Sequence, residues 1–371
     1  MNYLAVLGRQ PEISIAELEA TGFCTEIDRL GGTMKLAVEL EVKPLEYLLE
    51  LPEGKITVGV SDYSRGASRK TASNEALKLK KILARQGRSV RVVENHEAVL
   101  STATSLHNGL NGRNERKVEL IKTDRGWYRV IGVQDIEAYA RRDQARPARD
   151  AKVGMLPPKL AQILINLCGP LKPGATVLDP FCGTGVVLQE ALLMGYSVYG
   201  TDIGEKMIEC SNRNLKWLFS SRSRSRLSLQ GSLEHARSDS RCSENSQFQI
   251  SQGDATSFQW QQPIDAVACE GYLGKPFSKI PSEMELKEQK LECGAIMTGF
   301  LENLAGQIKK DTPVVVAMPA WLRPDGSYER LEILAILDKL GYNVNNKSLE
   351  GLIYHREGQI VARDIIILRK K

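Results

Sequence analysis

The segment Asp179-Pro180-Phe181-Cys182-Gly183-Thr184-Gly185 decides the fold of this chain. An apolar run precedes it and a second apolar stretch, 186–194, follows it, so a strand is predicted to turn into a helix here. Glycine lets the backbone adopt positive φ and approach a ligand closely, and the N-terminus of the following helix favours polar or negative groups. The turn alone is a weak signal. The lysine and serine that end a phosphate-binding loop are missing, and the spacing is not Gly-x-Gly-x-x-Gly.

Strands and helices alternate along the chain that surrounds this loop. The predicted strands are 176–178, 197–200, 248–252, 266–269, 313–318 and 365–368. The predicted helices are 158–167, 186–194, 205–218, 287–308 and 330–340. Such alternation predicts a mostly parallel sheet with helices on both faces. Ligands of such sheets bind beyond the carboxyl ends of the strands.

Two acidic residues follow the next two strand ends. Asp202 comes seventeen residues after Gly185. A carboxylate there can accept hydrogen bonds from both hydroxyls of a ribose, although a helix N-cap is the alternative interpretation. Asp254 follows the third strand and can accept from an adenine amino group. Each acid alone is a weak signal, but three strand ends in order, each with its polar residue, favour S-adenosylmethionine as the ligand.

The fourth strand end reads Glu270-Gly271-Tyr272-Leu273. The lone pair of an exocyclic amine is delocalised into its base, so the amine is a poor nucleophile. A hydrogen-bond acceptor that orients the amine and a ring that stacks on the base would help by positioning and electrostatics. Glu270 and Tyr272 can fill these roles, and Glu270 can also receive the displaced proton. A capping acid and a packing aromatic are the alternative.

The rest of the chain divides by composition. The first half has an α+β pattern, with a first unit at 1–55 and a second at 56–140. The stretch from 141 is polar and contains a proline, which indicates a linker at 141–157 before the domain at 158–371. Residues 220–246 are rich in Ser and Arg and predict a disordered insertion, either a tolerated surface segment or a basic arm that contacts nucleic acid.

A basic stretch lies in the second unit. Between Ser61 and Arg91 the chain has nine Lys or Arg and two acids. Such a run is either a solvated helix face or a phosphate-binding surface, and composition alone does not choose between them.

Composition excludes several classes of protein. The 371 residues are 42% hydrophobic and 26% charged, which is typical of a globular chain with more than one domain. No apolar run approaches the roughly 20 residues of a membrane span, and no basic region precedes the first apolar run, so we expect a cytoplasmic protein. Seven scattered cysteines and four scattered histidines predict neither a disulfide framework nor a metal site.

These motifs resemble a known family. The sequence of 179–185 is similar to the first motif of the amino-methylating RNA methylases that carry an N-terminal THUMP domain, and in particular to that of the tRNA guanine-N2 methyltransferases that act on guanosine 10. The likeness extends over nearly the whole chain except 220–246. Further similar stretches are 3–18, 134–147, 154–161, 354–359 and 363–365.

The resemblance implies a fold, an activity and a set of site residues. The fold would be a Rossmann-like S-adenosylmethionine methyltransferase domain, with a mostly parallel sheet and an antiparallel final strand. A ferredoxin-like unit at 1–55 and a tRNA-binding THUMP-like domain at 56–140 would precede it. The implied cofactor-binding residues are Asp179, Phe181, Cys182, Gly183, Thr184, Gly185, Asp202, Ile203, Asp254 and Ala255. The implied catalytic residues are Glu270 and Tyr272. The implied RNA-binding residues are Arg65, Arg69, Lys70, Lys78, Lys81 and Arg85. The partner would be tRNA, read by shape and phosphates, without membrane or metal, and a monomer is the working expectation.

The chain departs from the family at the fourth motif, which is usually Asp-Pro-Pro followed by Tyr or Phe. Here a longer carboxylate stands first and the rigid prolines are absent. Two alternatives to a tRNA guanine-N2 methyltransferase therefore stay open. One is methylation of another nucleic acid amine, in rRNA or in the adenine of DNA. The other is a tRNA-binding protein that retains the cofactor but has a degenerate catalytic motif.

Overall fold

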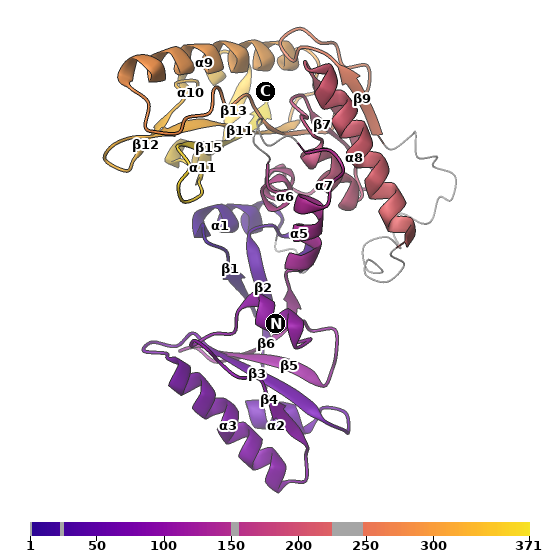
Figure 1. The fold of residues 1–371 in the computed structure, drawn as a ribbon, viewed down its shortest axis with the longest axis vertical. Coiled ribbons are helices and arrows are strands. Elements are labelled where there is room, and N and C mark those ends of the chain that lie inside the picture. Colours follow the sequence, from indigo (N-terminus) through magenta and orange to yellow (C-terminus); the bar gives the residue numbers. More distant parts are fainter. Residues whose placement is uncertain (1, 23–25, 150–155, 225–247) are drawn as a thin grey trace. The chain divides into compact units, whose positions relative to one another are not determined.

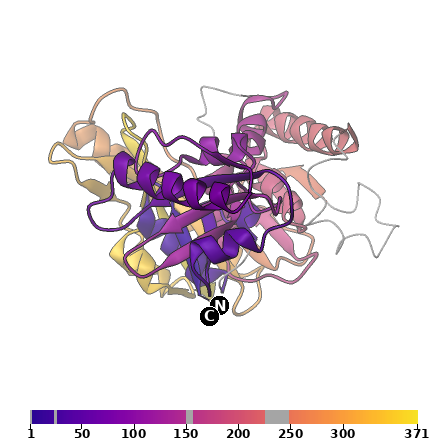
Figure 2. The ribbon, with the colours of Figure 1, turned by 90° about the horizontal axis from the view of Figure 1, so that it is seen from below.

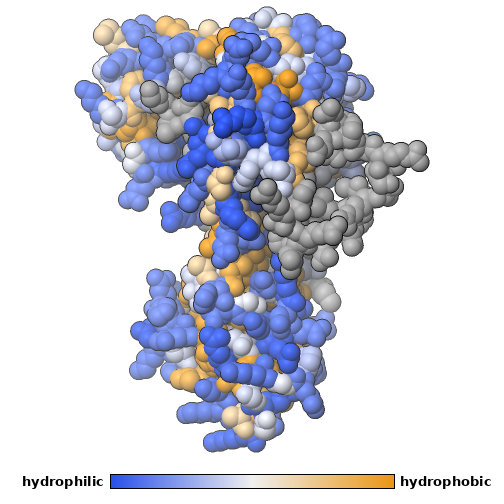
Figure 3. All heavy atoms as spheres, turned by 45° about the vertical axis from the view of Figure 1, so that its right-hand side comes forward, coloured by the Kyte–Doolittle hydropathy of each residue, from blue (hydrophilic) through white to orange (hydrophobic). Residues whose placement is uncertain are grey.

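The computed structural model describes residues 2–22, 26–149, 156–224 and 248–371. The chain forms two compact units. The small unit comprises residues 1–11 and 24–140, and the large unit comprises residues 12–23 and 141–371. On the face shown in Figure 3, hydrophilic residues dominate the surface and apolar residues lie in smaller groups. Within the described ranges, no helix combines the length and the apolar character that a membrane crossing requires.

The small unit is built on a six-stranded sheet with the order β1-β2-β6-β5-β3-β4 (Figure 1). Its strands are β1 (Tyr3–Leu7), β2 (Thr33–Glu39), β3 (Ile56–Asp62), β4 (Val90–Val92), β5 (Lys117–Lys122) and β6 (Trp127–Val133). Its helices are η1 (Ile27–Arg29), α2 (Pro44–Leu49), α3 (Arg69–Arg85) and α4 (Thr102–His107), and α5 (Ile136–Gln144) leads into the large unit. β3 pairs in parallel with β4 and β5, and the other pairs are antiparallel. The unit is therefore α+β, as the sequence predicts.

Helix α3 covers one face of this sheet (Figure 2). Its first turn is fixed by a reciprocal cap, in which Thr71 N–H donates to Ser68 Oγ at 3.2 Å and Ser68 N–H donates to Thr71 Oγ1 at 2.9 Å. Its buried side chains recur at helical spacing, at Ala72, Ala76, Leu79 and Leu83. This apolar face packs on the strands and leaves the basic side chains of the helix in solvent.

The large unit is built on a nine-stranded sheet whose main path has the order β13-β15-β11-β10-β7-β8-β9 (Figure 1). Its strands are β7 (Thr176–Asp179), β8 (Ser197–Asp202), β9 (Phe248–Gln252), β10 (Ala266–Glu270), β11 (Pro313–Leu322), β12 (Tyr328–Arg330), β13 (Tyr342–Val344), β14 (Ile353–Tyr354) and β15 (Val361–Lys370). Its helices are α1 (Pro11–Ala20), α6 (Pro158–Leu167), α7 (Val186–Leu193), α8 (Glu205–Arg224), α9 (Glu283–Ala305), α10 (Leu334–Leu337) and α11 (Asn346–Glu350).

The direction of winding reverses between β7 and β10. The chain runs outward from β7 through β8 to β9, and then returns to β10 and continues to β11 on the other side. These strands are parallel, while β15 pairs antiparallel with β11 along its whole length. The predicted Rossmann-like sheet with an antiparallel final strand is confirmed. The reversal leaves a crevice beyond the carboxyl ends of β7 and β10, where ligands of such sheets bind.

The structure divides the chain differently from the boundaries expected at its N-terminal end. No boundary lies at residue 55, because β2 pairs with β6 and thereby joins the sheet that contains β3 to β5. Helix α1 belongs to the large unit, since Ile13 and Ala16 are part of the core cluster around α6 and α7. The unit 1–55 therefore does not stand alone in the structure.

The expected linker and insertion also differ in part. Arg142, at the start of the expected linker 141–157, forms a bidentate ion pair with the buried Glu190 of α7, at 2.6 and 3.1 Å. Of the expected insertion 220–246, residues 220–224 continue α8, and 225–246 lie outside the described residues.

Candidate active site

A cavity of about 1080 Å³ lies beyond the carboxyl ends of β7, β8 and β10. It collects nearly all of the cofactor and catalytic residues expected from the sequence. The expected residues that line it are Asp179, Phe181, Cys182, Gly183, Thr184, Asp202, Ile203, Asp254, Ala255, Glu270 and Tyr272. Parallel strands bring these separate segments together because their carboxyl ends meet at one edge of the sheet.

The glycine turn between β7 and α7 forms one wall of the cavity. Gly183 has φ +52°, and a Cβ added to it would have only Phe181 O nearby, at 3.9 Å, so its Cα faces open space. Gly185, with φ +81°, serves another purpose. A Cβ there would lie 2.9 Å from Ser211 Oγ of α8. Gly185 is outside the cavity lining and allows α7 to pack closely on α8, which differs from the cofactor contact expected of it.

Asp202 connects the ends of β7 and β8. Its Oδ2 accepts from Gly183 N–H and its Oδ1 accepts from Gly204 N–H, both at 2.9 Å. A carboxylate has about four lone-pair sites, so both oxygens can accept further bonds. The backbone therefore holds this carboxylate in place against the cavity. Beside it, the apolar side chain of Ile203 is 70% exposed, which leaves a surface for a flat ring.

Asp254 lies at the exposed end of the cavity. Its Oδ1 accepts from the backbone N–H of Thr256 at 2.9 Å and from the Thr256 hydroxyl at 2.8 Å. These two hydrogen bonds lower the pKa of the Asp254 carboxyl group. Oδ2 has no partner among the described residues and can accept from a ligand. The neighbouring Ala255 is buried in the core.

Asp179 ends β7 as a buried carboxyl group at the base of the cavity. Burial raises its pKa well above the usual range, and the hydrogen bond from Phe181 N–H, at 3.2 Å, acts in the opposite direction. The carboxylates of Asp202 and Glu270 raise the pKa further. The residues that line the cavity include four carboxyl groups and two cations, Lys275 and Arg363, a balance that suits a cationic ligand.

Glu270 ends β10 and is held by an ion pair across the sheet. Arg363 of β15 donates from Nε to Glu270 Oε1 at 2.8 Å, and from Nη1 to Gln359 Oε1 at 3.2 Å. The side chains of Arg363 and Glu270 are only 8% and 17% exposed. Oε2 of Glu270 has no partner among the described residues. All three residues line the cavity, so Glu270 presents a fixed acceptor there.

The loop that follows β10 is fixed without the prolines of the family motif. Gly271 N–H donates to Ala317 O at 2.9 Å, a bond that proline could not make. A Cβ on Gly271 would also lie 2.8 Å from Met297 Sδ of α9. Further along the loop, Lys275 N–H donates to Oε1 of the buried Gln289 of α9 at 2.7 Å. Helix α9 therefore supplies the rigidity of this loop.

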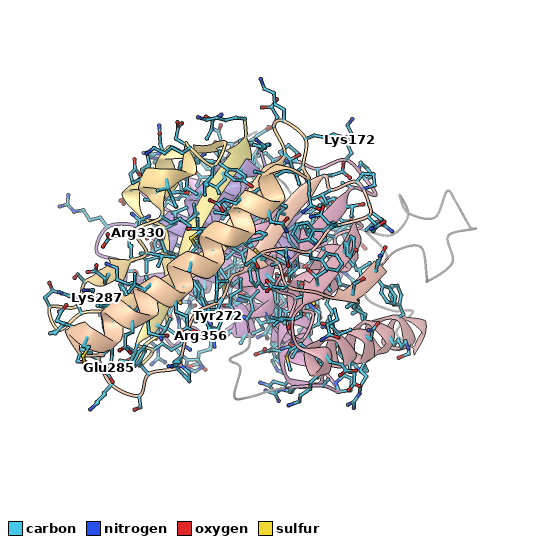
Figure 4. The ribbon with its side chains drawn as sticks, turned by 90° about the horizontal axis from the view of Figure 1, so that it is seen from above. Lys172, Tyr272, Glu285, Lys287, Arg330 and Arg356 are labelled. Atoms are coloured by element: carbon cyan, nitrogen blue, oxygen red, sulfur yellow. The ribbon has the colours of Figure 1, made fainter. Side chains whose placement is uncertain are left out.

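Tyr272 lies beside α9 (Figure 4) and its hydroxyl donates to Glu292 Oε1 at 3.0 Å. Burial and this carboxylate raise the pKa of Tyr272 to about 12, so the phenol is neutral. Its half-buried ring lines the cavity together with Phe181 and Phe277. These rings provide apolar surfaces on which a base can stack.

Sequence reasoning missed Arg363, Gln359 and Phe277 in the cavity wall. A signal for Arg363 was present, because Arg363 and Asp364 are two charged residues next to the apolar run 365–368 of the strand Val361–Lys370. Its partner Glu270 lies 93 residues earlier, and sequence spacing gives no indication of that contact.

The expected RNA-binding residues lie on or just before α3 in the small unit. Lys70, Lys78, Lys81 and Arg85 are exposed and recur at helical spacing on the face opposite the buried one. Among the described residues, none of these four pairs with a carboxylate. Glu75 is the one acid of α3, and Lys122 pairs with it at 2.9 Å.

The remaining two expected RNA-binding residues differ from this group. Arg69 forms an exposed ion pair with Glu94 at 3.1 Å. Arg65 lies in the loop before the helix, where its backbone N–H donates to the Asp124 carboxylate.

Several known proteins are similar to this chain in sequence or in structure. Residues 146–289 match the family model described as the RMKL-like methyltransferase domain. A tRNA (guanine(10)-N2)-dimethyltransferase of Pyrococcus abyssi is 30% identical over 230 residues, which are 58% of this chain and 68% of that protein. A protein of the same name from Methanothermobacter thermautotrophicus is 47% identical over 76 residues, 20% of this chain but only 22% of the relative's length. The crystal structure of TrmN from Thermus thermophilus superposes with a TM-score of 0.45 at 19% identity, over 94% of this chain and 86% of that one.

The doubly wound sheet, the cavity at its point of reversal and the matched domain define a methyltransferase. Within that class, the chain belongs to the family of the tRNA (guanine(10)-N2)-dimethyltransferases.

Proposed function

We propose that this protein is a tRNA methyltransferase that uses S-adenosylmethionine and methylates the exocyclic N2 amine of the guanine at position 10. The observation that carries the proposal is the position of Glu270. Its oriented carboxylate lines the same cavity as the Gly183 turn and Asp202, so an acceptor for an amine lies beside a cofactor cleft. The relatives that are named for this activity support the choice of base and position.

The residues of the cavity fit the cofactor. The open space at Gly183 admits a ligand close to the backbone, Asp202 suits its ribose, and Asp254 suits its adenine amino group. The excess of carboxylates favours a cation. When bound, S-adenosylmethionine supplies an electrophilic methyl group on a positively charged sulfur.

The chain's own residues would handle the base. The guanine leaves its stack to enter the cavity, as bases do in enzymes of this kind. The neutral ring of Tyr272 and that of Phe277 stack on it and exclude water. A Glu270 oxygen accepts one N2–H and turns the nitrogen lone pair toward the methyl group. The amine proton released on methylation passes to the Glu270 carboxylate and from there to solvent.

The exposed face of α3 would bind the tRNA backbone. Four of its cations, Lys70, Lys78, Lys81 and Arg85, lack carboxylate partners among the described residues, which favours phosphate contacts over a merely solvated helix. We therefore assign the THUMP-like role to the small unit. A tRNA substrate, together with free thiols at all five cysteines that the structure describes, supports a cytoplasmic location, and we propose that the enzyme acts as a monomer.

The test uses unmodified tRNA transcripts and S-adenosylmethionine with a labelled methyl group. Mass spectrometry of the nucleosides should show N2-methylated guanosine, and replacing the guanosine at position 10 should abolish the signal. Glu270→Ala should reduce transfer by roughly 100-fold or more while the variant still binds the cofactor. Label in rRNA or in an adenine amine instead would assign the other substrates. Binding of cofactor and tRNA without any transfer would identify a binding protein and refute the proposal.

A further inference from the structure

The ion pair between Arg363 and Glu270 joins strands that are not neighbours. Glu270 of β10 lies opposite Ala317 of β11, and Ala317 lies opposite Ile365 of β15. Arg363 is two residues from Ile365, so its side chain is on the same face of the sheet. It reaches Glu270 diagonally across β11, past the small side chains of Ala317 and Pro319. The ion pair thus fixes the end of β10 from β15, and β11 lies between these two strands.

Arg363 has a partner on its other side as well. Gln359, in the loop before β15, accepts from Nη1 while Glu270 accepts from Nε. A planar guanidinium with two bonded edges has few alternative orientations. The carboxylate of Glu270 is therefore held through one oxygen, and the other oxygen stays available in the cavity.

A second ion pair on the same strand shows what a purely structural pair looks like here. Asp364, the next residue of β15, points to the opposite face and pairs with Arg330 of β12 at 2.7 and 3.2 Å. Neither Asp364 nor Arg330 lines the cavity. Figure 4 shows Arg330 well apart from Tyr272. Both ion pairs join an arginine to a carboxylate and involve a residue of β15. They differ because only the pair of Arg363 and Glu270 lines the cavity.

We propose that Arg363 is a positioning residue for the reaction, which orients the carboxylate of Glu270 toward the exocyclic amine in place of the rigid prolines of the family motif. This inference rests on the proposed function. Gln359 acts in the same chain of contacts by orienting Arg363. The Arg363–Glu270 ion pair forms in the protein without cofactor or tRNA. We therefore expect Arg363 to affect the rate of methyl transfer and not the binding of cofactor or tRNA.

The expected effects separate positioning from stability. Arg363→Gln should lower kcat by about 10- to 100-fold, the cost of a misplaced reacting group, with KM for both substrates within about threefold. Arg363→Lys should recover part of kcat, since it keeps the charge but cannot bond Glu270 and Gln359 together in one plane. The control Arg330→Gln should lower the melting temperature and leave kcat unchanged.

A double-mutant cycle tests whether Arg363 acts through Glu270. In a Glu270→Gln background, Arg363→Gln should have little further effect on kcat. The proposal is overturned if the two substitutions multiply their effects, or if Arg363→Gln leaves kcat unchanged. If Arg363→Gln does not fold, Gln359→Ala replaces it, with a smaller expected loss of kcat and the same cycle.

Crystal structures of the wild type and of Arg363→Gln provide a readout that does not depend on activity. Glu270 should occupy one side-chain conformation in the wild type and several, or a different one, in the variant. An unchanged Glu270 would refute the role of Arg363 even if no tRNA is methylated. A wild-type enzyme that transfers no methyl group would refute the proposed function instead, so the two failures are distinguishable.

Discussion

Asp179 is a buried carboxyl group whose pKa burial raises well above its usual range. Such a group binds its proton more tightly in the folded than in the unfolded state. The folded state therefore gains stability as the pH falls through the raised pKa, and it loses that stability above it. Where Asp179 is ionised, its buried charge weakens the fold, and we attribute the presence of this residue to the cationic cofactor.

We predict that Asp179→Asn stabilises the cofactor-free protein by on the order of 1–3 kcal/mol above the raised pKa of Asp179, because a neutral amide replaces a buried charge there. The gain should shrink as the pH is lowered, since the wild-type carboxyl group then becomes neutral too. Denaturant unfolding at several pH values measures both effects. The same variant should bind S-adenosylmethionine more weakly by calorimetry. A variant that is less stable than the wild type at every pH would show that the carboxyl group itself contributes to the fold.

The two glycines of the cofactor turn should respond differently to alanine. Both have positive φ, so each substitution costs roughly 1–2 kcal/mol of backbone strain. At Gly183 the methyl group enters the open cavity, and we expect cofactor affinity to fall by about tenfold or more beyond this loss of stability. At Gly185 it meets Ser211 of α8, and we expect a larger loss of stability. Calorimetric titration and thermal unfolding of both variants separate the two roles. Equal losses of affinity after correction for unfolding would contradict the assignment.

Helix α3 offers a matched pair of neighbouring lysines for testing its role. Lys81 lies on the exposed face with Lys78 and Arg85, whereas Lys80 lies on the flank of the helix. Loss of one phosphate contact should lower the slope of log affinity against log salt by about 0.7–0.9. We therefore expect Lys81→Ala to weaken tRNA binding by about 1 kcal/mol and to reduce the salt slope, and Lys80→Ala to have less effect.

Filter binding at several salt concentrations measures these differences. Cofactor affinity should be unchanged in both variants, because α3 lies outside the cavity residues. If Lys80→Ala and Lys81→Ala weaken binding equally, the helix contributes only general charge. If neither does, the exposed face of α3 is a solvated surface.

At the scale of elements, local pattern accounts for where the expected cofactor residues lie, but not for how Glu270 is held. Asp202 and Gly183 follow directly from a strand that ends in a glycine turn, a pattern contained within a few residues. The expected helix at 330–340 is reduced to Leu334–Leu337, and its first expected residue, Arg330, pairs with β11 in the strand Tyr328–Arg330. Tertiary pairing thus overrides the local pattern at the start of this segment.

The catalytic side depends on contacts between segments distant in sequence. Arg363 holds Glu270 across 93 residues, and Gln289 of α9 fixes the backbone of Lys275. The sequence showed the departure from Asp-Pro-Pro but not what replaces its rigidity. Only the packing of α9 and β15 against the end of β10 reveals that replacement.

At the scale of the whole molecule, the N-terminal segment is divided between the two units. Helix α1 belongs to the large unit, although β1, just before it, belongs to the small unit. Ile13 is buried in the core cluster of the large unit. The buried Glu17 accepts from Asn166 Nδ2 of α6 at 2.7 Å, and Glu19 pairs with Lys347 at 3.3 Å. A methyltransferase domain cut at residue 141 or 158 therefore lacks part of its own core.

We predict that a fragment of residues 141–371 is less stable than the same unit in the full chain by about 3–5 kcal/mol. The estimate combines the lost burial of an isoleucine with the loss of a buried hydrogen bond. For a unit of this size the melting temperature should fall by roughly 10 °C. Adding a synthetic peptide of residues 11–22 should restore much of the difference, because ligand binding to the folded state alone stabilises it.

A peptide with Ile13→Asp is the matched control, since it keeps the length and removes the apolar contact with the core cluster. It should not raise the melting temperature of the fragment. If the fragment is as stable as the full chain, α1 contributes no stability to the large unit. Restoration by the native peptide alone would instead show that the N-terminal helix is a structural part of the methyltransferase domain, so that residues 12–22 must be present for the cofactor cavity to be stable.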